Sequence, residues 1–356
     1  VIEQLKFFFI VKMCVTAQHR EMLDSVLGVF NLSPDYDLDI MTPDQDLFDV
    51  TCKVLTKIKE VLLKENADMV VVHGDTTTAM ATAMAAFYLQ IPVAHVEAGL
   101  RTYDIYSPFP EEFNRQVVAR ATRFHFAPTE NARQNLLNEK VLNEHIYVTG
   151  NTSIDALFSL VAKAKNSNYP NDLLKCLPIL SGNENIHPRI ILVTGHRREN
   201  FGKGLEDICY ALIDISKKHP EVEIIYPVHL NPNVRNTVNN ILSGINNIHI
   251  VEPMDYLSFI KLMDASYMII TDSGGIQEEA PSLGKPVLVT RDTTERIEAI
   301  QTGVAILVGS DRKKIVDAAH LLLTDNVAYK HISKIHNPYG DGLASERICT
   351  FIKGVL

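Results

Sequence analysis

Residues 271–281 have the sequence TDSGGIQEEAP and directly follow an apolar run at 267–270. The apolar run predicts a buried parallel strand. A strand that ends in Ser273-Gly274-Gly275 and continues into a helix is typical of phosphate binding, because glycine lets the backbone approach an anion and the first helical N–H groups point at it. The alternative is an ordinary helix start, with Ser273 as the cap and glycine for tight packing. These residues alone leave both interpretations open.

Similar short apolar runs recur along the whole chain and alternate with longer amphipathic stretches. Residues 47–63 and 78–88 are examples of predicted helices. The predicted strands cover residues 13–15, 69–72, 93–96, 124–127, 146–148, 190–194, 223–227, 248–251, 267–271, 287–289 and 305–308. This alternation predicts an α/β fold, with parallel sheets covered by helices on both faces.

The chain has 356 residues, enough for about two domains with separate cores. Its least periodic segment, 166–188, is rich in Asn, Pro, Ser and Gly, which indicates a domain boundary. We expect an N-terminal Rossmann-like domain at 1–168, a linker at 169–187 and a C-terminal Rossmann-like domain at 188–337. A last helix follows the breaker cluster 338–342, and we expect residues 341–356 to pack back on the first domain. Ligands bind at the carboxyl ends of parallel strands, so two facing sheets predict a site in the cleft between them.

The composition favours an ordinary soluble protein, with 46% hydrophobic and 22% charged residues. A net charge of −9 argues against nucleic-acid and membrane-surface binding, but it allows a small anionic ligand. The five cysteines lie far apart and have no zinc or redox spacing, which favours reduced thiols in the cytoplasm. The apolar run 7–11 is too short to span a bilayer.

Three clusters with carboxylates follow predicted strands in the first half. Asp75 is either an acid/base carboxylate or a helix N-cap. Glu97 ends a buried strand, where a charge is costly, so either a pair with Arg101 or a functional role must explain it. Glu111 and Glu112 follow a proline and also suit the first turn of a helix.

The second half contributes cationic groups. His196 and Arg197 follow the strand 190–194 and form a plausible anion clamp with Arg198, although Arg198 can also pair with Glu199 on the surface. His229 follows the strand 223–227, and such a histidine alone more often belongs to a loop. Together with the Ser-Gly-Gly stretch, these groups fit a nucleoside diphosphate bound by the second domain while the first acts on the attached group. The sequence has no dinucleotide glycine motif, Walker lysine or convincing metal set.

These motifs resemble those of the non-hydrolysing UDP-N-acetylglucosamine 2-epimerases of bacteria. They run in order over nearly the whole chain: TAQHREML at 16–23, HGDTT at 73–77, HVEAGLRT at 95–102, PEE with NR at 110–115, GHRREN at 195–200, and the stretches 271–285, 291–296 and 337–342.

The resemblance implies a GT-B fold of two Rossmann-like domains and the reversible conversion of UDP-N-acetylglucosamine (UDP-GlcNAc) to UDP-N-acetylmannosamine (UDP-ManNAc) without NAD or a metal. In this family, UDP is eliminated to leave a 2-acetamidoglucal and is then added back with the opposite configuration at carbon 2. The resemblance further implies a homodimer formed through the first domain and a product used in cell-surface polysaccharide biosynthesis.

The resemblance also assigns site residues. The acid/base candidates are Asp75, Glu97 and Glu111, with His196 beside them, and which carboxylate takes which proton stays open. The residues expected to bind UDP are His229, Phe259, Ser273, Gly274, Gly275, Glu279 and Arg296.

A second, allosteric UDP-GlcNAc site matches Gln18, His19, Gln45, Glu111 and Arg197. Glu21 stands where the family often has Gln, and Asp44 where it often has Arg, so the strength of the allostery stays open.

The sequence departs from the family at its start. Its first residues, VIEQLK, resemble the end of the helix that follows the family's first strand and Gly-Thr-Arg-Pro-Glu-Ala loop. That loop contributes an Arg, and a nearby Lys, to the UDP site. Either the true protein is longer or this is a truncated form, and we expect a truncated form to be inactive and poorly folded.

Other functions compete with the epimerase. A GT-B glycosyltransferase has a similar cradle for its UDP-sugar donor, but it does not require three carboxylates together in the first domain. A hydrolysing epimerase and a catalytically inactive sensor of nucleotide sugars are further alternatives.

Overall fold

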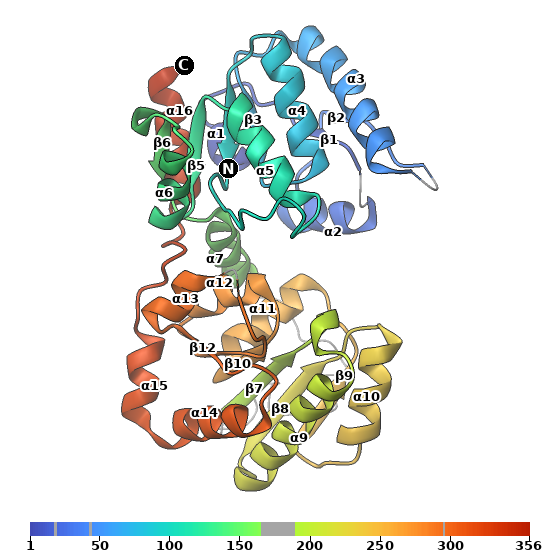
Figure 1. The fold of residues 1–356 in the computed structure, drawn as a ribbon, viewed down its shortest axis with the longest axis vertical. Helices are drawn as coiled ribbons and strands as arrows, with labels where there is room; N and C mark the ends of the chain where they lie inside the picture. The colour runs from blue at the N-terminus through green and yellow to red at the C-terminus, as the bar shows by residue number, and fades with distance from the viewer. Residues whose placement is uncertain (18–19, 43–44, 165–188, 295) are drawn as a thin grey trace. The chain divides into compact units, whose positions relative to one another are not determined.

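The computed structural model describes residues 1–17, 20–42, 45–164, 189–294 and 296–356. Contacts divide the chain into two compact units (Figure 1). Unit 1 comprises Val1–Asp155 and Tyr339–Leu356, and unit 2 comprises Ala156–Pro338. The linker expected at 169–187 lies outside the described residues.

Unit 1 contains two parallel sheets and their covering helices. The sheets have the orders β1-β2 and β3-β4-β5-β6. The elements are α1 (Ile2–Leu5), β1 (Cys14–Val15), α2 (Arg20–Phe30), β2 (Tyr36–Asp37), α3 (Leu47–Glu65), β3 (Val70–His73), α4 (Thr77–Tyr88), β4 (Val93–Val96), α5 (Glu111–Ala121), β5 (Phe124–Ala127), α6 (Glu130–Asn138), the 3₁₀ turn η1 (Asn143–His145), β6 (Ile146–Val148) and α16 (Ala344–Val355). Helix α7 (Thr152–Ala164) begins in unit 1 and continues into unit 2.

Residues of β4 contribute to two separate apolar clusters of unit 1. Val93 packs in a cluster with α3 and α4, whereas Ala94 and Val96 pack with Phe126, α1 and α16. Successive side chains of a strand point to opposite faces, so helices cover both faces of the sheet. All four residues of β4 are buried, which explains why the strand is a continuous apolar run except for one histidine.

The last helix, α16, returns to unit 1 and is held there by a cap from a distant residue. Its N-cap position, Leu343, supplies no side-chain hydrogen bond. The carboxylate of Asp155 instead accepts the N–H groups of Ala344 and Ser345 at 3.2 and 2.7 Å. A carboxylate also complements the positive end of the helix dipole. Ile348 and Ile352 of α16 are buried in the cluster around Phe126.

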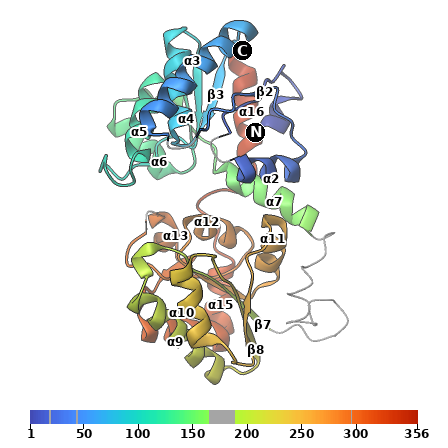
Figure 2. The ribbon, with the colours of Figure 1, turned by 90° about the vertical axis from the view of Figure 1, so that its right-hand side faces the viewer.

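Unit 2 is built around one six-stranded parallel sheet. Its elements are β7 (Arg189–Thr194), the 3₁₀ turn η3 (Arg198–Asn200), α9 (Lys203–Lys218), β8 (Val222–Pro227), α10 (Pro232–Leu242), β9 (Ile248–Val251), α11 (Tyr256–Ala265), β10 (Met268–Thr271), α12 (Gly274–Ser282), β11 (Val287–Val289), α13 (Ile297–Thr302), β12 (Ala305–Leu307), α14 (Arg312–Thr324) and α15 (Asn326–Ser333). Figure 2 shows α9 and α10 side by side in this unit.

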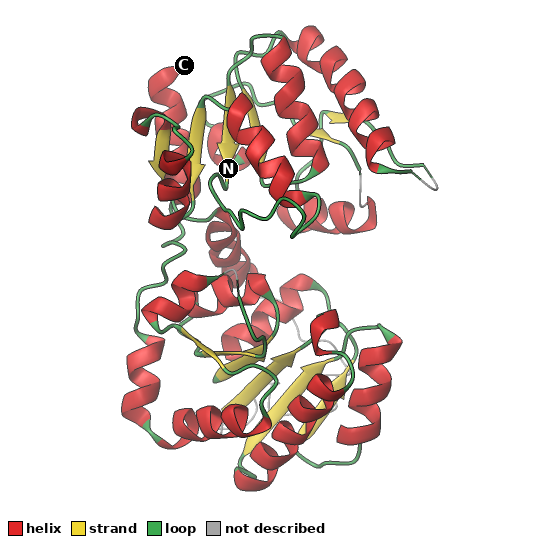
Figure 3. Cartoon of the chain, viewed as in Figure 1, coloured by secondary structure: helices red, strands yellow, loops and turns green. Residues whose placement is uncertain are grey.

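The strand order of unit 2 is β12-β11-β10-β7-β8-β9. With β7 counted as the first strand, this is the doubly wound Rossmann order 3-2-1-4-5-6. The direction of winding reverses between β7 and β10, and ligands bind at such a switch point. Within each unit the strands lie inside and the helices surround them (Figure 3).

The predicted α/β class with parallel sheets is confirmed. Each predicted strand has a counterpart whose ends differ by no more than one residue. Strand β2 was not predicted, because it has only two residues, Tyr36 and Asp37. No helix in the described part of the chain is long and apolar enough to cross a membrane.

Candidate active site

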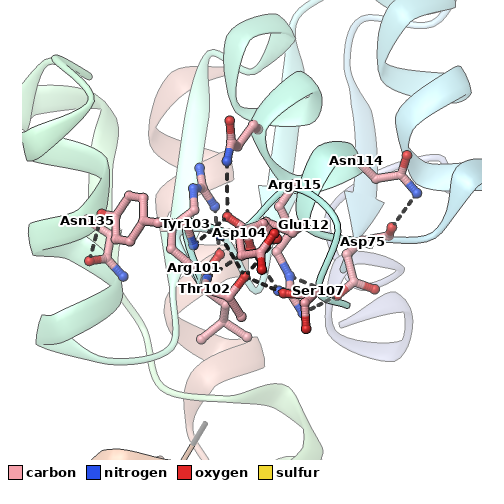
Figure 4. Close-up of polar contacts among 12 residues, drawn as sticks. Asp75, Arg101, Thr102, Tyr103, Asp104, Ser107, Glu112, Asn114, Arg115 and Asn135 are labelled. Carbon is pink, nitrogen blue, oxygen red and sulfur yellow. Dashed lines mark hydrogen bonds and ion pairs between the residues drawn. The ribbon is translucent and has the colours of Figure 1, made fainter. Parts of the chain in front are cut away.

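Asp75, the first predicted acid/base residue, follows β3 but does not cap the next helix. Thr76 occupies the N-cap position of α4, and its hydroxyl accepts the N–H of Ala79 at 3.2 Å. The Asp75 carboxylate instead binds Arg115, whose Nε and Nη2 lie 2.9 and 2.7 Å from Oδ2. The side chain of Asn114 donates to the main-chain oxygen of Asp75 at 2.9 Å (Figure 4). The capping interpretation of Asp75 is therefore wrong.

Glu97 follows the neighbouring strand, β4, and pairs with a histidine from β3. Its Oε2 lies 3.2 Å from Nε2 of His73, the register partner of Val96. Arg101 instead donates from Nε and Nη2 to Glu139 at 2.6 and 2.9 Å, so the suggested pair with Glu97 is wrong. The backbone of Glu97 has a φ of 67°, in the left-handed region. That conformation costs a non-glycine residue on the order of 1–3 kcal/mol and occurs preferentially at functional sites.

The electrostatics of His73 and Glu97 suit proton transfer. The side chain of His73 is 59% exposed. Loss of hydration works to lower its pKa, but the hydrogen bond with Glu97 and the charges of Glu97 and Asp75 raise the pKa above its ordinary value. A histidine whose pKa lies above its usual range next to a carboxylate can accept and return a proton near neutral pH. This pair could not be predicted from the sequence, because a histidine at the end of a strand is most often structural.

Two further histidines are buried in the same sheet and stay neutral. Burial lowers the pKa of His95 to about 4 and that of His125 to about 3. These two residues are register partners on β4 and β5. Nε2 of His95 lies 2.8 Å from the carbonyl oxygen of Gly74, which has a φ of +71°. A neutral His95 can donate this hydrogen bond and so fixes the turn that carries Asp75.

The two neighbouring glutamates of α5 have different surroundings. Both lie in the first turn of the helix, where negative charge complements the helix dipole, as predicted. Glu112 is fully buried and hydrogen bonded, whereas Glu111 is partly exposed and forms no hydrogen bond or ion pair with other described residues. The carboxylate of Glu111 is therefore accessible, whereas that of Glu112 is held inside unit 1.

In unit 2, buried Asp272 organises the switch point between β10 and β7. Its Oδ2 accepts the main-chain N–H groups of His196 and Arg197, each at 2.9 Å. A Cβ on Gly195 would lie 2.9 Å from the hydroxyl of Tyr226, so a larger residue would have to displace this buried tyrosine. The turn is thereby fixed with the side chain of His196 exposed.

His196 and His229 stack, with their ring centroids 5.5 Å apart. Nδ1 of His196 lies 3.5 Å from Oδ1 of Asp272. Burial lowers the pKa of His196, and the neighbouring charges of Arg197 and His229 lower it further, although Asp272 opposes them. Nδ1 of His229 accepts the N–H of Asn231 at 3.1 Å, which leaves Nε2 to meet a ligand. Two adjacent imidazoles at a strand end suit an anionic ligand.

The Ser273-Gly274-Gly275 stretch begins α12 as predicted. Ser273 occupies the N-cap position, but its hydroxyl makes no capping hydrogen bond. Its main-chain oxygen accepts the side-chain amide of Gln277 at 3.1 Å. A Cβ on Gly275 would meet nothing within 4 Å, so packing does not require glycine there. The simple capping interpretation therefore explains neither Ser273 nor Gly275.

Glu279, the predicted ribose contact, lies in α12 near the start of α11. Burial raises the pKa of the Glu279 carboxyl to about 7, and the charge of Glu278 adds to this, although the hydrogen bond from Tyr256 opposes it. The Tyr256 hydroxyl donates to Oε1 of Glu279 at 2.9 Å. Phe259 lies on α11, partly buried. Arg296 donates to Glu278 at 2.8 Å.

The structure describes only part of the residue set predicted for the allosteric site. Gln18 and His19 lie outside the described residues. The side chain of Gln45 accepts the N–H of Thr42 at 2.7 Å and donates to the carbonyl of Ile40 at 3.0 Å, so its own loop uses both ends. The allosteric role of this set stays a prediction.

The sequence left open whether Glu199 pairs with Arg198 on the surface. Nε of Arg291 donates to Glu199 at 2.7 Å, so Glu199 has a partner from a distant turn. The described residues contain no group of His, Cys, Asp or Glu that could hold a metal ion.

Two Rossmann-like units, each with polar groups after the carboxyl ends of its parallel strands, define an α/β protein of the GT-B class. The model of the UDP-N-acetylglucosamine 2-epimerase family matches residues 4–353. The UDP-N-acetylglucosamine 2-epimerase of Yersinia pestis is 57% identical over 343 residues, which are 96% of this chain and 90% of that protein. The enzyme of Escherichia coli K12 is 53% identical over 347 residues, 97% of this chain and 91% of its own.

A solved structure gives the same result. The crystal structure of UDP-GlcNAc 2-epimerase from Neisseria meningitidis bound to UDP-GlcNAc has a TM-score of 0.86 and 46% identity, and the match covers 99% of this chain and 95% of that one. This chain belongs to the UDP-N-acetylglucosamine 2-epimerase family, which confirms the resemblance of its motifs.

Proposed function

We propose that this protein interconverts UDP-GlcNAc and UDP-ManNAc by inverting carbon 2 of the sugar. The observation that carries the proposal is the pair of acid/base groups on neighbouring strand ends: Asp75 with Arg115 after β3, and Glu97 with His73 after β4. Removing the weakly acidic proton at carbon 2 requires a base held in place, and returning it on the other face requires an acid. The names of the relatives support the same substrate.

In the proposed reaction, a base takes the proton from carbon 2 while the bond between carbon 1 and the UDP oxygen breaks. The electrons of the C–H bond form the double bond of a 2-acetamidoglucal, and UDP leaves with the electron pair of the C–O bond. UDP then adds back to carbon 1, and carbon 2 receives a proton on its opposite face. Asp75, Glu97 and Glu111 form the acid/base set. The sequence and the structure leave their order in the two proton transfers open.

Unit 2 is proposed to bind the UDP part. The first N–H groups of α12, with Ser273, Gly274 and Gly275, hold the diphosphate together with His196 and His229. Donors and cations at this position stabilise the charge that develops on departing UDP. Glu279, Phe259 and Arg296 are proposed to contact the ribose and the remainder of UDP. Solved relatives include a Methanocaldococcus jannaschii UDP-GlcNAc 2-epimerase in complex with UDP-GlcNAc and UDP, which supports this role.

We further propose a cytoplasmic homodimer that supplies UDP-ManNAc for cell-surface polysaccharides. Unpaired Cys14, Cys52, Cys209 and Cys349 support a reducing compartment. Large exposed apolar side chains on the neighbouring helices α3 and α4 support a dimer through unit 1: Leu63, Phe87 and Tyr88 are exposed by 59%, 58% and 69%. Light scattering of the purified protein, with and without Phe87→Glu, tests the dimer.

One experiment tests the activity. The protein is incubated with UDP-GlcNAc in deuterated water, and the products are followed by proton NMR. We expect UDP-ManNAc to form and deuterium to enter carbon 2 of both sugars. Release of free ManNAc with UDP would indicate a hydrolysing enzyme instead. Binding of UDP-GlcNAc without any exchange would indicate a sensor, and either result would overturn the proposal.

A further inference from the structure

A series of three charged side chains connects the interior of unit 1 to Asp75. Arg115 contacts Asp75 through Nε and Nη2, and its Nη1 donates to Oε2 of Glu112 at 3.1 Å. The exposed side-chain fraction falls from 23% for Asp75 to 15% for Arg115 and 0% for Glu112. The guanidinium therefore joins an accessible carboxylate to a fully buried one (Figure 4).

Glu112 is held by more than its ion pair. It accepts the main-chain N–H groups of Thr102 and Tyr103 at 3.0 and 3.2 Å and the side-chain amide of Gln116 at 3.1 Å. Burial raises the pKa of Glu112, but these hydrogen bonds and the one from Arg115 outweigh burial and lower it. Glu112 therefore stays ionised and rigid, and it gives Arg115 a fixed anchor.

The geometry requires an arginine. One planar guanidinium directs two donors to Oδ2 of Asp75 and a third to Glu112, which the single ammonium of lysine cannot reproduce. Buried ion pairs contribute little net stability, because the cost of removing both charges from water offsets their attraction. A buried pair that ends on an accessible carboxylate is therefore better explained by positioning than by stability.

The two oxygens of Asp75 differ as a result. Oδ2 receives both donors from Arg115. Oδ1 has no hydrogen-bond donor within reach among the described residues. Because the main-chain oxygen of Asp75 is also fixed by Asn114, both the turn and the carboxylate are restrained.

We propose that Arg115, anchored by Glu112, is a positioning residue that fixes Oδ2 of Asp75 and leaves Oδ1 as the oxygen that exchanges the substrate proton. The inference rests on the proposed function, in which Asp75 belongs to the acid/base set. Arg115 acts through Asp75 and does not itself contact the reacting carbon. Its effect should therefore fall on the chemical step.

The test compares Arg115→Lys and Glu112→Gln with the wild type in steady-state epimerisation of UDP-GlcNAc. Lysine keeps the positive charge of Arg115 but loses the planar set of three N–H donors. Glutamine keeps the shape of Glu112 but loses the negative charge that anchors Arg115. We expect kcat to fall roughly 10- to 100-fold in each variant, as a misplaced catalytic group predicts. KM should change by less than about threefold, because substrate binding itself is not altered.

Glu139→Gln is the matched control. It breaks another two-pronged arginine pair in unit 1, and the side chain of Arg101 in that pair is 0% exposed. We expect it to lower the melting temperature while kcat stays within about twofold of the wild type. Arg115→Ala provides a second measurement, because millimolar guanidinium should restore part of its kcat if the positive charge beside Asp75 is what is missing.

The outcomes separate the inference from the function. A wild type without epimerisation would refute the proposed function. An active wild type with unchanged kcat in Arg115→Lys and Glu112→Gln would refute only the positioning role. A fall in kcat that merely follows the loss of folded protein, as measured by circular dichroism and shared by Glu139→Gln, would also refute it.

Discussion

The strand ends of the two units carry opposite kinds of polar group, carboxylates in unit 1 and hydrogen-bond donors in unit 2. In unit 1 two of the predicted acid/base carboxylates already have a basic partner: Asp75 has Arg115, and Glu97 has His73. In unit 2 the carboxylate at the switch point, Asp272, is buried and faces inward to main-chain N–H groups. The groups left outward there are donors, namely the first N–H groups of α12 and the imidazole of His229.

This difference indicates a division of labour. A carboxylate that a neighbouring side chain holds in place can take and return a proton at a fixed position, which suits chemistry at carbon 2. Donors at a helix N-terminus suit a diphosphate, whose negative charge grows as it departs. The proposed reaction requires both properties, and we propose that each unit supplies one of them.

The largest expected effect tests the chemical role of unit 1. Glu97→Gln keeps the size of the side chain and removes its ability to take a proton. We expect kcat for epimerisation to fall by about 10²–10⁴, which is the usual contribution of one acid/base group. UDP affinity should stay within about twofold, because the proposed UDP contacts lie in unit 2.

NMR exchange in deuterated water measures the rate, and calorimetry measures the affinity for UDP. Near wild-type exchange by the variant would remove Glu97 from the acid/base set. An equal loss in exchange rate and UDP affinity would contradict the proposal that unit 1 carries out the chemistry and unit 2 binds UDP.

A second prediction concerns Glu279, a carboxylate of unit 2 whose pKa is strongly raised. Burial raises the pKa of Glu279 to about 7. An unfolded glutamate has a pKa of about 4.3, so between these values the folded state binds more protons than the unfolded state. The free energy of unfolding therefore falls as pH rises through this window, by up to about 3 kcal/mol. The loss is complete above about pH 7.

Glu279→Gln should remove this dependence. We expect the variant to gain stability relative to the wild type between pH 5 and pH 8, when both are unfolded by urea and followed by circular dichroism. Glu60→Gln, on the exposed surface of α3, is the control for loss of one negative charge. Parallel curves for Glu279→Gln and the wild type would mean that Glu279 is ionised at no extra cost.

The sheets could be predicted from sequence for a physical reason. A parallel strand covered on both faces must be apolar throughout, so β5 and β10 appear as unbroken or nearly unbroken apolar runs. β2 has only two residues, one of them an aspartate, and gives no such signal. The polar clusters after these strands could also be located, because the edge of a parallel sheet places functional groups there.

The partners of these polar groups could not be predicted. Asp75 and Arg115 are 40 positions apart, and Arg101 and Glu139 are 38 apart. The sequence offers many charges of each sign, and only the folded backbone selects which of them meet. Nearness in sequence favoured a pair between Glu97 and Arg101, but the left-handed turn at Glu97 directs its carboxylate to His73. Tyr256 escaped notice for the same reason, since its partner Glu279 is 23 positions away.

The smallest expected effect tests the donor side of the comparison at Ser273 and Gly275. A serine that caps a helix contributes about 1 kcal/mol, but the Ser273 hydroxyl makes no such bond, so Ser273→Ala should cost less than about 0.5 kcal/mol. Gly275→Ala has room for its methyl group and should stabilise α12 by about 0.5–1 kcal/mol. If the stretch binds a diphosphate, that same methyl group blocks its close approach, and the Kd for UDP should rise about tenfold, or 1.4 kcal/mol. Calorimetry with UDP and thermal melting of both variants measure the two quantities together. A variant that melts higher and binds UDP more weakly identifies a phosphate cradle, whereas unchanged affinity would leave only an ordinary helix start.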